Sequence, residues 1–431
     1  MAPHVAFVDT YGPSSARFAP AFQDAGYTPI RVCSTTDVPR LYRRHVDPFV
    51  YPVEVLHRGD LAATVQQLAS LHTVAVIPGC ELGVELADSL SEALHPLTGT
   101  PTNGSALSAA RRDKYVMIER IKAQGLRGAR QLLVNDEEQL YKWHAEAGGM
   151  VVVKPLRSAG GDGVSWCRTP HDSVAAFRRL STRKTDGGEL RDGVVAQEYL
   201  VGGEYIVNTV SRDGAHHVCD IWKTHRISAN GVLDLEVACQ VMPRAGDIQD
   251  MLVAYAGAVL DALGIQHGAA HAEIKVTPAG PCLIEIGARV AGQDMPDLAL
   301  RAIGESQVEW MVDAYIRPKR FAQRCGQPYH VMRHVASAFM VAPRSGRLLA
   351  YHGLPAIEQL DSYVDMQILV RPGEFLTTTI DDSSYPIKII LAHEIEEILL
   401  RDLWTLRQID GSAKSASGSS GSRAARSTRS S

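Results

Sequence analysis

The chain has 431 residues, of which 45% are hydrophobic and 21% charged, a composition typical of globular proteins, and this length predicts two to four domains. The formal net charge of −4 excludes a protein that binds nucleic acid through a generally basic surface. The seven cysteines include no CxxC pair, which argues against a disulfide scaffold or a zinc ribbon and fits a reducing cytosol.

The sequence shows no targeting or membrane signal. The N-terminus leads directly into an apolar segment without the pattern of a signal peptide. Residues 61–80 contain no acidic, lysine or arginine side chain, but Gln66, Gln67, Pro78 and Gly79 interrupt the stretch, so it predicts a helix followed by a strand. We therefore expect a cytoplasmic protein, monomeric or homodimeric, that contacts neither membrane nor nucleic acid.

The first part of the chain alternates strands with helices. Apolar runs predict strands at Val5–Val8, Pro29–Cys33 and Thr73–Ile77. A helix capped by Ser14 or Ser15 should end near Gly26, and a second should span Leu61–Leu71. This alternation predicts a parallel sheet with helices on its faces, an α/β domain over about residues 1–105.

The pattern then becomes α+β and mainly antiparallel. A helix is predicted from Ser105 to Gln124, closed by Gly125, and another over Met251–Leu263. Residues 330–405 predict a smaller mixed lobe, and the Ser/Arg-rich segment 411–431 should be disordered. The other predicted elements are strands: Met150–Lys154, Val164–Cys167, Val194–Tyr199, Tyr205–Val210, His217–Trp222, His271–Val276 and Cys282–Ile286.

A glycine-rich loop, Leu156–Gly163, joins two of these strands directly after Lys154. Without a GK[ST] motif it is no Walker A loop, and because a strand follows it, it is no Rossmann fingerprint. Such a loop can fold over a triphosphate and offer backbone N–H groups, while Lys154 supplies positive charge. The alternative is a surface hairpin with an exposed lysine.

Paired glutamates are the most informative feature. His271, Glu273 and Lys275 share one face of a predicted strand. If the hairpin is centred on Ala279, Glu285 on the next strand stands opposite Glu273, with Cβ atoms about 4.5–5.5 Å apart and a repulsion of about 3 kcal/mol. A divalent cation would remove this repulsion, and carboxylate oxygens suit Mg²⁺. The alternative is a solvated acidic face or salt bridges with neighbouring cations.

Two further motifs are ambiguous alone. Gln197–Tyr205 predicts a strand end, a Gly-Gly turn and a new strand, where backbone groups beside Tyr199 and Leu200 could contact an adenine edge. A simple hairpin turn has the same pattern. Arg111-Arg112-Asp113-Lys114 is by itself typical of a solvated helix face.

The order of these motifs resembles the ATP-grasp carboxylate–amine ligases. They are a lysine at a helix, a V-K-P strand with a glycine loop, an E-Y-L turn, an H-x-E strand and an E-I-G-x-R strand. The similarity covers about residues 4–400, and Pro78–Asp88 and Arg111–Tyr115 resemble the L-amino-acid ligase branch, which makes dipeptides. It implies a pre-ATP-grasp domain (1–105), an ATP-grasp domain (106–320, lid about 125–205), a C-terminal lobe (321–410) and a tail (411–431).

The resemblance also implies the cofactors ATP and Mg²⁺, with Mn²⁺ able to replace Mg²⁺, and roles for individual residues. Glu273 and Glu285 would ligate the metal, and Arg289 would bind the acyl phosphate and its tetrahedral successor. Candidate substrate residues are Glu81, Glu85, His225, His271, Gly292 and Gln293. Glu81 and Glu85 could instead contact a further metal ion, and His225 and His271 are also candidate bases for the amine or, alternatively, structural histidines. The ATP-binding residues would be Lys114, Lys154, Ser158, Gly160, Gly161, Gly163, Glu198, Tyr199, Leu200, Val201, Glu204 and Gln240, with Lys154 also catalytic.

One position departs from the family pattern. Many ATP-grasp enzymes have Asn two residues after the second glutamate, where this chain has Gly287. The resemblance predicts that the enzyme activates a carboxylate as an acyl phosphate and joins it to an amine, releasing ADP and phosphate. The alternatives are a carboxylase or ligase of purine or cofactor synthesis, and a non-catalytic nucleotide-binding protein.

Overall fold

The structure is a computed structural model that describes residues 3–36, 38, 47–158, 160–182 and 193–411. The chain forms two compact units, one of residues 1–224 and 240–335 and the other of residues 225–239 and 336–431. The finer division at residues 105, 320 and 410 stays a prediction. Apart from Gly411, the predicted tail lies outside the described residues.

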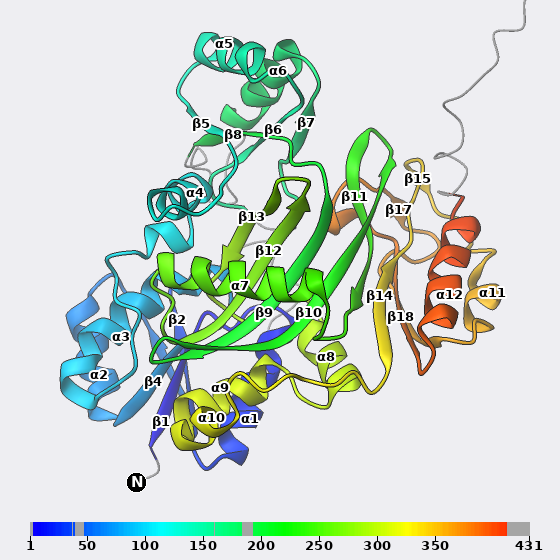
Figure 1. Ribbon diagram of the computed structural model, residues 1–431. Helices are drawn as coiled ribbons and strands as arrows, with labels where there is room; N and C mark the ends of the chain where they lie inside the picture. Colours follow the sequence, from blue (N-terminus) through cyan, green and yellow to red (C-terminus); the bar gives the residue numbers. More distant parts are fainter. Residues whose placement is uncertain (1–2, 37, 39–46, 159, 183–192, 412–431) are drawn as a thin grey trace, which may run out of the picture. The chain divides into compact units, whose positions relative to one another are not determined.

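A four-stranded parallel sheet, in the order β3-β2-β1-β4, forms the N-terminal part of the first unit, as predicted. Successive side chains of β1 point to opposite faces: Phe7 packs with Phe18 of α1, and Val8 packs with Leu68 of α2 and Leu90 of α3. Figure 1 shows α2 and α3 beside the sheet. The elements are β1 (His4–Val8), α1 (Phe18–Asp24), β2 (Thr28–Cys33), β3 (Val53–Leu56), α2 (Leu61–Ser70), β4 (Thr73–Pro78) and α3 (Val84–Thr98).

The predicted cap of α1 is wrong. Ser14 and Ser15 lie inside a short 3-10 helix, Pro13–Arg17, and α1 begins at Phe18 without a side-chain cap. The elements β3 and α3 were not predicted. Helix α3 contains Pro96, but Val84, Ala87, Leu90 and Leu94 are buried at helical spacing, so the signal for this helix was present in the sequence and was overlooked.

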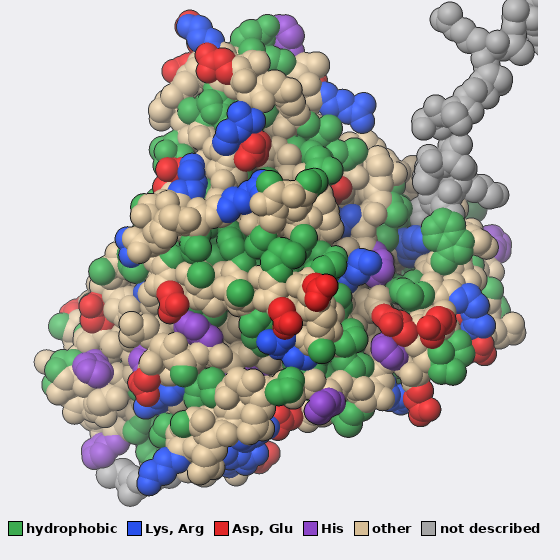
Figure 2. All heavy atoms as spheres, viewed as in Figure 1, with side chains coloured by type: hydrophobic (Ala, Val, Ile, Leu, Met, Phe, Trp, Pro, Cys, Tyr) green, Lys and Arg blue, Asp and Glu red, His purple; other side chains and the backbone are tan. Residues whose placement is uncertain are grey.

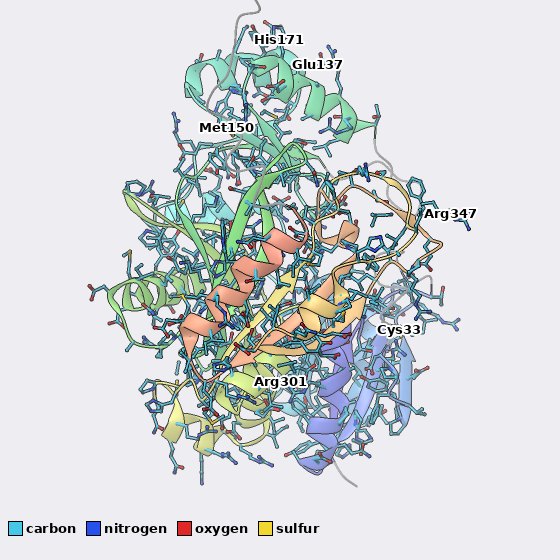
Figure 3. The ribbon with its side chains drawn as sticks, turned by 90° about the vertical axis from the view of Figure 1, so that its right-hand side faces the viewer. Cys33, Glu137, Met150, His171, Arg301 and Arg347 are labelled. Atoms are coloured by element: carbon cyan, nitrogen blue, oxygen red, sulfur yellow. The ribbon has the colours of Figure 1, made fainter. Side chains whose placement is uncertain are left out.

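A second sheet is antiparallel, in the order β5-β8-β6-β7, and α5 and α6 cover one face of it. Helix α6 begins with a capping box, in which Thr169 and Asp172 exchange hydrogen bonds between side chain and backbone. Figure 3 shows Glu137 and His171 on these two helices and Met150 nearer the sheet. The elements are β5 (Gln131–Val134), α5 (Glu137–Ala147), β6 (Val151–Pro155), β7 (Ser165–Cys167), α6 (Pro170–Ser181) and β8 (Val194–Glu198).

The central sheet of the first unit has the order β13-β12-β9-β10. Its apolar face packs on α4 and α7, through side chains such as Met117, Ile121 and Leu252 (Figure 1). The helix predicted from Ser105 begins only at Lys114, because the Asp113 side chain accepts the backbone N–H groups of Tyr115 and Val116 and caps it. The elements are α4 (Lys114–Ala123), β9 (Gly203–Arg212), β10 (Ala215–Ala229), β11 (Val232–Val241), α7 (Asp247–Ala262), β12 (Gly268–Thr277), β13 (Gly280–Gly287), α8 (Met295–Ile303), α9 (Gln307–Ile316) and α10 (Pro318–Arg324).

The second unit contains a sheet in the order β10-β11-β14-β18-β16, packed on α12. It includes the tip of the β10/β11 hairpin, residues 225–239, which the sequence did not assign to the C-terminal lobe. Its other elements are β14 (His334–Phe339), β15 (Gly346–Arg347), α11 (Leu354–Glu358), β16 (Tyr363–Ile368), β17 (Phe375–Leu376), β18 (Ile387–His393) and α12 (Glu396–Ile409).

Two surface properties agree with the sequence. Figure 2 shows Lys and Arg side chains interspersed with Asp and Glu side chains over the face in view. Within the described ranges, none of the helices is long and apolar enough to cross a membrane.

Candidate active site

The β12/β13 hairpin places Glu273 and Glu285 directly opposite each other, as predicted. The turn itself differs, because Thr277 pairs with Gly280 and leaves a two-residue turn centred between Pro278 and Ala279. A β-bulge then inserts Ile284 as an extra residue on β13. This bulge restores the opposition, since an unbroken register would place Ile284 opposite Glu273.

Lys114 joins three elements beside these carboxylates. Its Nζ lies 3.0 Å from Glu285 Oε2 and donates a hydrogen bond of 2.7 Å to the backbone oxygen of Ser158. One lysine at the start of α4 therefore connects the glycine loop to strand β13. In the glycine loop, Gly160, Gly161 and Gly163 have positive φ, and Ala159 lies outside the described residues.

Lys154 is buried on β6, close enough to both glutamates to interact with them. The pKa of Lys154 is lowered to about 8, chiefly by burial and also by the charge of Lys114, although Glu285, Glu273 and Glu204 raise it. Below about pH 8 the ammonium group is charged and can attract phosphate oxygens. Above that pH the unliganded site loses this charge.

We therefore expect the affinity for ATP to fall as the pH rises from 7 to 9.5. At high pH, Lys154 is neutral in the free protein and must take up a proton before it can attract the phosphate oxygens. The Lys154→Arg variant should show a flatter profile, since a guanidinium stays charged over this range. Lys154→Ala should bind ATP weakly at every pH. Isothermal titration calorimetry with ATP at several pH values measures this, and equal profiles for parent and Lys154→Arg would contradict it.

Glu81 stands between two arginines. Its Oε1 lies 2.5 Å from Arg112 Nη1, and its Oε2 lies 2.9 Å from Arg289 Nε. Although burial raises the pKa of the Glu81 carboxyl, Arg289 and Arg112 outweigh this and hold that pKa below its usual range. The carboxylate thus holds Arg289, whose Nη1 also donates to the Val290 backbone oxygen.

The position of Glu81 depends on a close backbone crossing. Gly79 follows β4, and a Cβ atom there would lie 2.7 Å from the backbone oxygen of Asp9 at the end of β1. Only glycine allows this approach, which brings the turn containing Glu81 to the carboxyl end of the parallel sheet. Ligands of open α/β sheets bind at this edge.

The surroundings of Gly287 give a reason for its departure from the family pattern. A Cβ atom at this position would lie 2.8 Å from Glu81 Oε2 and 3.2 Å from Arg289 Cζ. A side chain at residue 287, such as that of asparagine, would therefore have to displace the Glu81–Arg289 pair.

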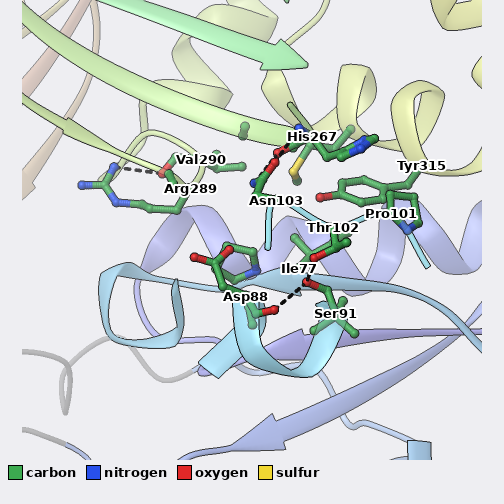
Figure 4. A pocket seen from close by; sticks show the side chains of 17 residues that line it. Ile77, Asp88, Ser91, Pro101, Thr102, Asn103, His267, Arg289, Val290 and Tyr315 are labelled. Atoms are coloured by element: carbon green, nitrogen blue, oxygen red, sulfur yellow. Dashed lines mark hydrogen bonds between the residues drawn. The ribbon is translucent and has the colours of Figure 1, made fainter. Parts of the chain in front are cut away.

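These side chains line a small pocket that is open to solvent. A second pocket shares Arg289 with the first and is lined by Asp88, Ser91, Asn103 and His267 among others. Figure 4 shows the Arg289 guanidinium pointing away from Asp88 and Ser91. The first pocket is lined by Glu81, Arg112, Lys114, Met117, Ser158, Glu285, Ile286, Gly287 and Arg289.

The predicted adenine-binding segment forms a link between two sheets, from β8 to β9, and is not a hairpin turn. Lys275 contacts this segment at two points. Its Nζ donates a hydrogen bond of 3.1 Å to the Leu200 backbone oxygen and lies 4.8 Å from the centre of the Tyr199 ring. The Glu198 carboxylate accepts two hydrogen bonds of 2.8 Å from Arg130, one from its backbone N–H and one from its Nε. Two acceptors predicted to contact ATP, the Glu198 carboxylate and the Leu200 oxygen, thus have protein partners here. Val201 is exposed, and Glu204 and Gln240 are buried.

The remaining predicted substrate residues are dispersed. Glu85 lies 3.2 Å from Arg157 of the glycine loop. His271 is buried beside Glu273, with Nε2 3.4 Å from Glu273 Oε1. Gly292 and Gln293 lie between β13 and α8, and Gln293 has a φ of 54°. His225 belongs to the second unit.

The donors present fit a hard divalent cation. Two opposed carboxylates supply oxygen ligands, and the lysines beside them suit the phosphate oxygens that would complete the coordination together with water. Over the described parts of the chain, no three His, Cys, Asp or Glu side chains form a metal-binding cluster. We therefore expect Glu273 and Glu285 to be the two carboxylates that would hold Mg²⁺, with phosphate oxygens and water as further ligands.

Sequence reasoning missed Arg111, which is fully buried and not on a solvated face. Its Nη1 lies 2.7 Å from Asp88 Oδ2, and its Nε donates to the Leu263 backbone oxygen. Three further backbone oxygens, those of Asn103, Gly104 and Gly264, accept its other N–H groups. The adjacent Asp113 cap and the arginine-rich motif were the available signals for an ordered role.

We expect Arg111→Met to lower the free energy of unfolding by about 3–5 kcal/mol, because it leaves the Asp88 carboxylate buried without its cation. Adding Asp88→Asn should restore part of the stability by removing that charge. Urea unfolding of both variants and the parent measures this. A change below about 1 kcal/mol in the single variant, the size of an exposed ion pair, would contradict a structural role.

Comparison with known proteins identifies the family of this chain. Residues 149–297 match the ATP-grasp domain family. Dapdiamide A synthase from Enterobacter agglomerans is 32% identical over 397 residues, which cover 91% of this chain and 92% of that protein.

Two solved structures share the fold. An L-amino acid ligase from Bacillus licheniformis has a TM-score of 0.71 and 17% identity, over 94% of this chain and 97% of that chain. An N5-carboxyaminoimidazole synthetase from Staphylococcus aureus, complexed with ADP, has a TM-score of 0.63 and 12% identity, over 95% and 98%. The predicted family is confirmed: the chain belongs to the ATP-grasp family and is an ATP-dependent carboxylate–amine ligase.

Proposed function

We propose that the enzyme activates one amino acid as an acyl phosphate and joins it to the amino group of a second, with release of ADP and phosphate. The observation that carries this proposal is the pocket in which Lys114 and Glu285 face Arg289 and Glu81. In this pocket, Lys114 can bind phosphate oxygens, and the Arg289 guanidinium can bind the oxygens of the carboxylate that reacts.

The first step forms the acyl phosphate. A carboxylate oxygen attacks the γ-phosphorus of ATP, and the bond from that phosphorus to the oxygen of ADP breaks. Lys114 and Lys154 stabilise the charge on the phosphoryl oxygens, and the hydrogen bond from Lys114 to Ser158 holds the glycine loop beside them. Mg²⁺, when bound by Glu273 and Glu285, would neutralise further phosphate charge.

The second step forms the amide. The amine attacks the acyl carbon, the tetrahedral intermediate loses phosphate as the carbon–oxygen bond breaks, and the nitrogen gives up a proton. We assign to Arg289 the binding of the oxygens of this intermediate, a role supported by the contacts with Glu81 and the Val290 oxygen that orient its guanidinium. Phosphate, unlike oxide, is a good leaving group, which explains the need for activation.

The relatives support amino acids as substrates. One is named for the synthesis of dapdiamide A, and another is named an L-amino acid ligase. We further propose ATP with Mg²⁺ or Mn²⁺ as cofactors, a cytoplasmic location, and a monomeric or homodimeric state. The predicted placement of adenine along Glu198–Val201, with Glu204 and Gln240 nearby, is part of the same proposal.

A pairwise screen of amino acids tests the substrate class. The purified protein with ATP and Mg²⁺ should release ADP and phosphate only with certain pairs, and mass spectrometry should detect the corresponding dipeptide. Arg289→Lys serves as the control, because it keeps the charge but loses the planar fork and should lower turnover. ADP release that requires bicarbonate and no amino acid would instead identify a carboxylase, and binding of ATP without turnover would identify a non-catalytic protein.

A further inference from the structure

Two neighbouring arginines, Arg111 and Arg112, have opposite surroundings. Arg111 is fully buried, and its guanidinium donates to the Asp88 carboxylate and to four backbone oxygens. The Arg112 side chain is also largely buried, with 10% of its surface exposed. Within the described residues, however, it makes a single hydrogen bond, to Glu81, and its Nε is buried without an acceptor. Buried donors usually have acceptors, so the unused N–H groups of Arg112 need an explanation.

Arg112 lies in the wall of the first pocket. In the part of the chain that the structure describes, the other charged residues of this wall are Glu81, Lys114, Glu285 and Arg289. Glu285 pairs with Lys114, and Glu81 pairs with both arginines. Three cations therefore face two carboxylates, and the formal excess of one positive charge favours an anionic ligand.

Glu81 holds the two guanidinium groups of this pocket side by side. Its Oε1 accepts a hydrogen bond of 2.5 Å from Arg112 Nη1, and its Oε2 accepts one of 2.9 Å from Arg289 Nε. Because both oxygens belong to one carboxylate, the two guanidiniums must be neighbours. Two neighbouring guanidiniums can donate to different oxygens of one tetrahedral anion, and their planar N–H groups match the geometry of phosphate.

The other groups of the pocket favour phosphate as this anion. Lys114 donates to the backbone oxygen of Ser158, in the glycine loop that we expect to cover the phosphates of ATP. Glu285 is one of the two proposed metal ligands. In the proposed reaction a phosphoryl group leaves ATP, joins the substrate carboxylate and departs as phosphate, so its charged oxygens need cations at each of these stages.

We propose that Arg112, together with Arg289, binds the transferred phosphoryl group, first in the acyl phosphate and then as released phosphate. Arg112 is then a further catalytic residue, and Glu81 is a positioning residue for both arginines. By neutralising charge on the phosphoryl oxygens, Arg112 assists both the formation of the acyl phosphate and the departure of phosphate. This inference rests on the proposed function, because the phosphoryl group concerned is that of the acyl phosphate.

Binding of inorganic phosphate to the enzyme in the presence of ADP and Mg²⁺ tests the contact. Arg112→Gln should raise the dissociation constant of phosphate about tenfold to hundredfold, because a charged hydrogen bond is lost. Arg112→Lys keeps the charge but loses the planar fork, so it should restore part of the affinity. Isothermal titration calorimetry measures these constants.

Arg178→Gln is the matched control for this change. Arg178 also pairs with a glutamate from another element, since it donates two hydrogen bonds to Glu137 of α5, but it is exposed and is not among the residues that line the pocket. This variant should leave phosphate binding unchanged. Glu81 keeps its hydrogen bond to Arg289 in Arg112→Gln, so the fold should be retained, which melting curves check.

A double-mutant cycle separates direct contact from an effect transmitted through Glu81. In Glu81→Gln, Arg112 has no carboxylate to orient. If Arg112 contacts phosphate itself, adding Arg112→Gln should still weaken phosphate binding about tenfold or more. If Arg112 acts only by holding Glu81, the added substitution will change nothing, and that result would overturn the proposal.

Steady-state kinetics identify the anion that Arg112 binds. Arg112→Gln should lower kcat and slow positional isotope exchange in ATP with the first substrate alone, whereas KM for either amino acid should change little. A raised KM for one amino acid with an unchanged kcat would place Arg112 at the carboxylate of that substrate and overturn the phosphoryl assignment.

These outcomes separate the inference from the proposed function. An active parent enzyme whose Arg112→Gln variant keeps its kcat and its affinity for phosphate overturns the inference alone. A parent that releases no ADP with any amino-acid pair overturns the proposed function. A loss of phosphate affinity in Arg112→Gln would then still support the phosphate contact, because calorimetry with ADP and phosphate requires no turnover.

Discussion

Glu273→Gln and Glu285→Gln should each abolish most of the ligase activity at ordinary Mg²⁺ concentrations. The two carboxylates face each other across β12 and β13 and would share one cation, so the loss of either leaves a single charged oxygen ligand. We expect the dissociation constant for the metal to rise on the order of 10²-fold or more. The double variant should be little worse than either single variant, because residues that act as a unit are not additive.

The metal-free proteins should differ in stability. Glu285 pairs with the buried Lys114, so Glu285→Gln leaves this cation less compensated and should lower the melting temperature. Glu273→Gln relieves repulsion between opposed carboxylates and should not lower it. The structure thus changes the expectation from repulsion alone, under which both variants would melt no lower than the parent.

Two measurements check these expectations: steady-state rates and Mn²⁺ binding across a metal titration, and melting curves without metal. Glu138→Gln is a suitable control, because Glu138 is exposed and pairs with Lys142 on the same helix surface. Full activity in either single variant would disprove the shared site.

Gly287→Ala should lower kcat/KM on the order of 10²-fold while leaving the fold intact, since a displacement of about 1 Å in a positioned group can have this effect. The new Cβ would lie 2.8 Å from Glu81 Oε2 and must displace a carboxylate that two arginines hold. The displaced Glu81 would release Arg289 from its orientation. Gly287→Asn should be at least as harmful, although it restores the residue common in related enzymes.

Gly257→Ala provides the matched control for this change. Gly257 lies in α7, and a Cβ atom there meets nothing within 4 Å. This variant should keep full activity and be slightly more stable, because alanine favours a helix. Steady-state kinetics and thermal melting compare the two glycines. Normal activity in Gly287→Ala would show that the Glu81–Arg289 pair is not needed for catalysis.

The sequence predicted the local elements and the chemistry of single motifs. Periodicity identified the parallel sheet, the strands around Lys154 and the hairpin that carries Glu273 and Glu285, because alternation and turn residues are local properties. The order of these motifs also identified the family, which the 32% identical relative confirms.

Partners distant in the chain could not be derived in this way. The pairing of Glu81 with Arg289 joins residues that are 208 positions apart. The hydrogen bonds that link Asp220, Asn208 and His271 connect three strands. Arg111 had the pattern of a solvated face, yet the fold surrounds it with backbone oxygens from distant loops.

The arrangement of the paired glutamates depends both on the local sequence and on the tertiary structure. The sequence alone determined that both carboxylates lie on adjacent strands of one hairpin. Whether they share a face was decided by a bulge at Ile284, which the alternating pattern does not reveal. Tertiary structure decided the rest, because Lys114, Gly287 and the Glu81–Arg289 pair acquire their roles only when packing brings separate elements within contact distance.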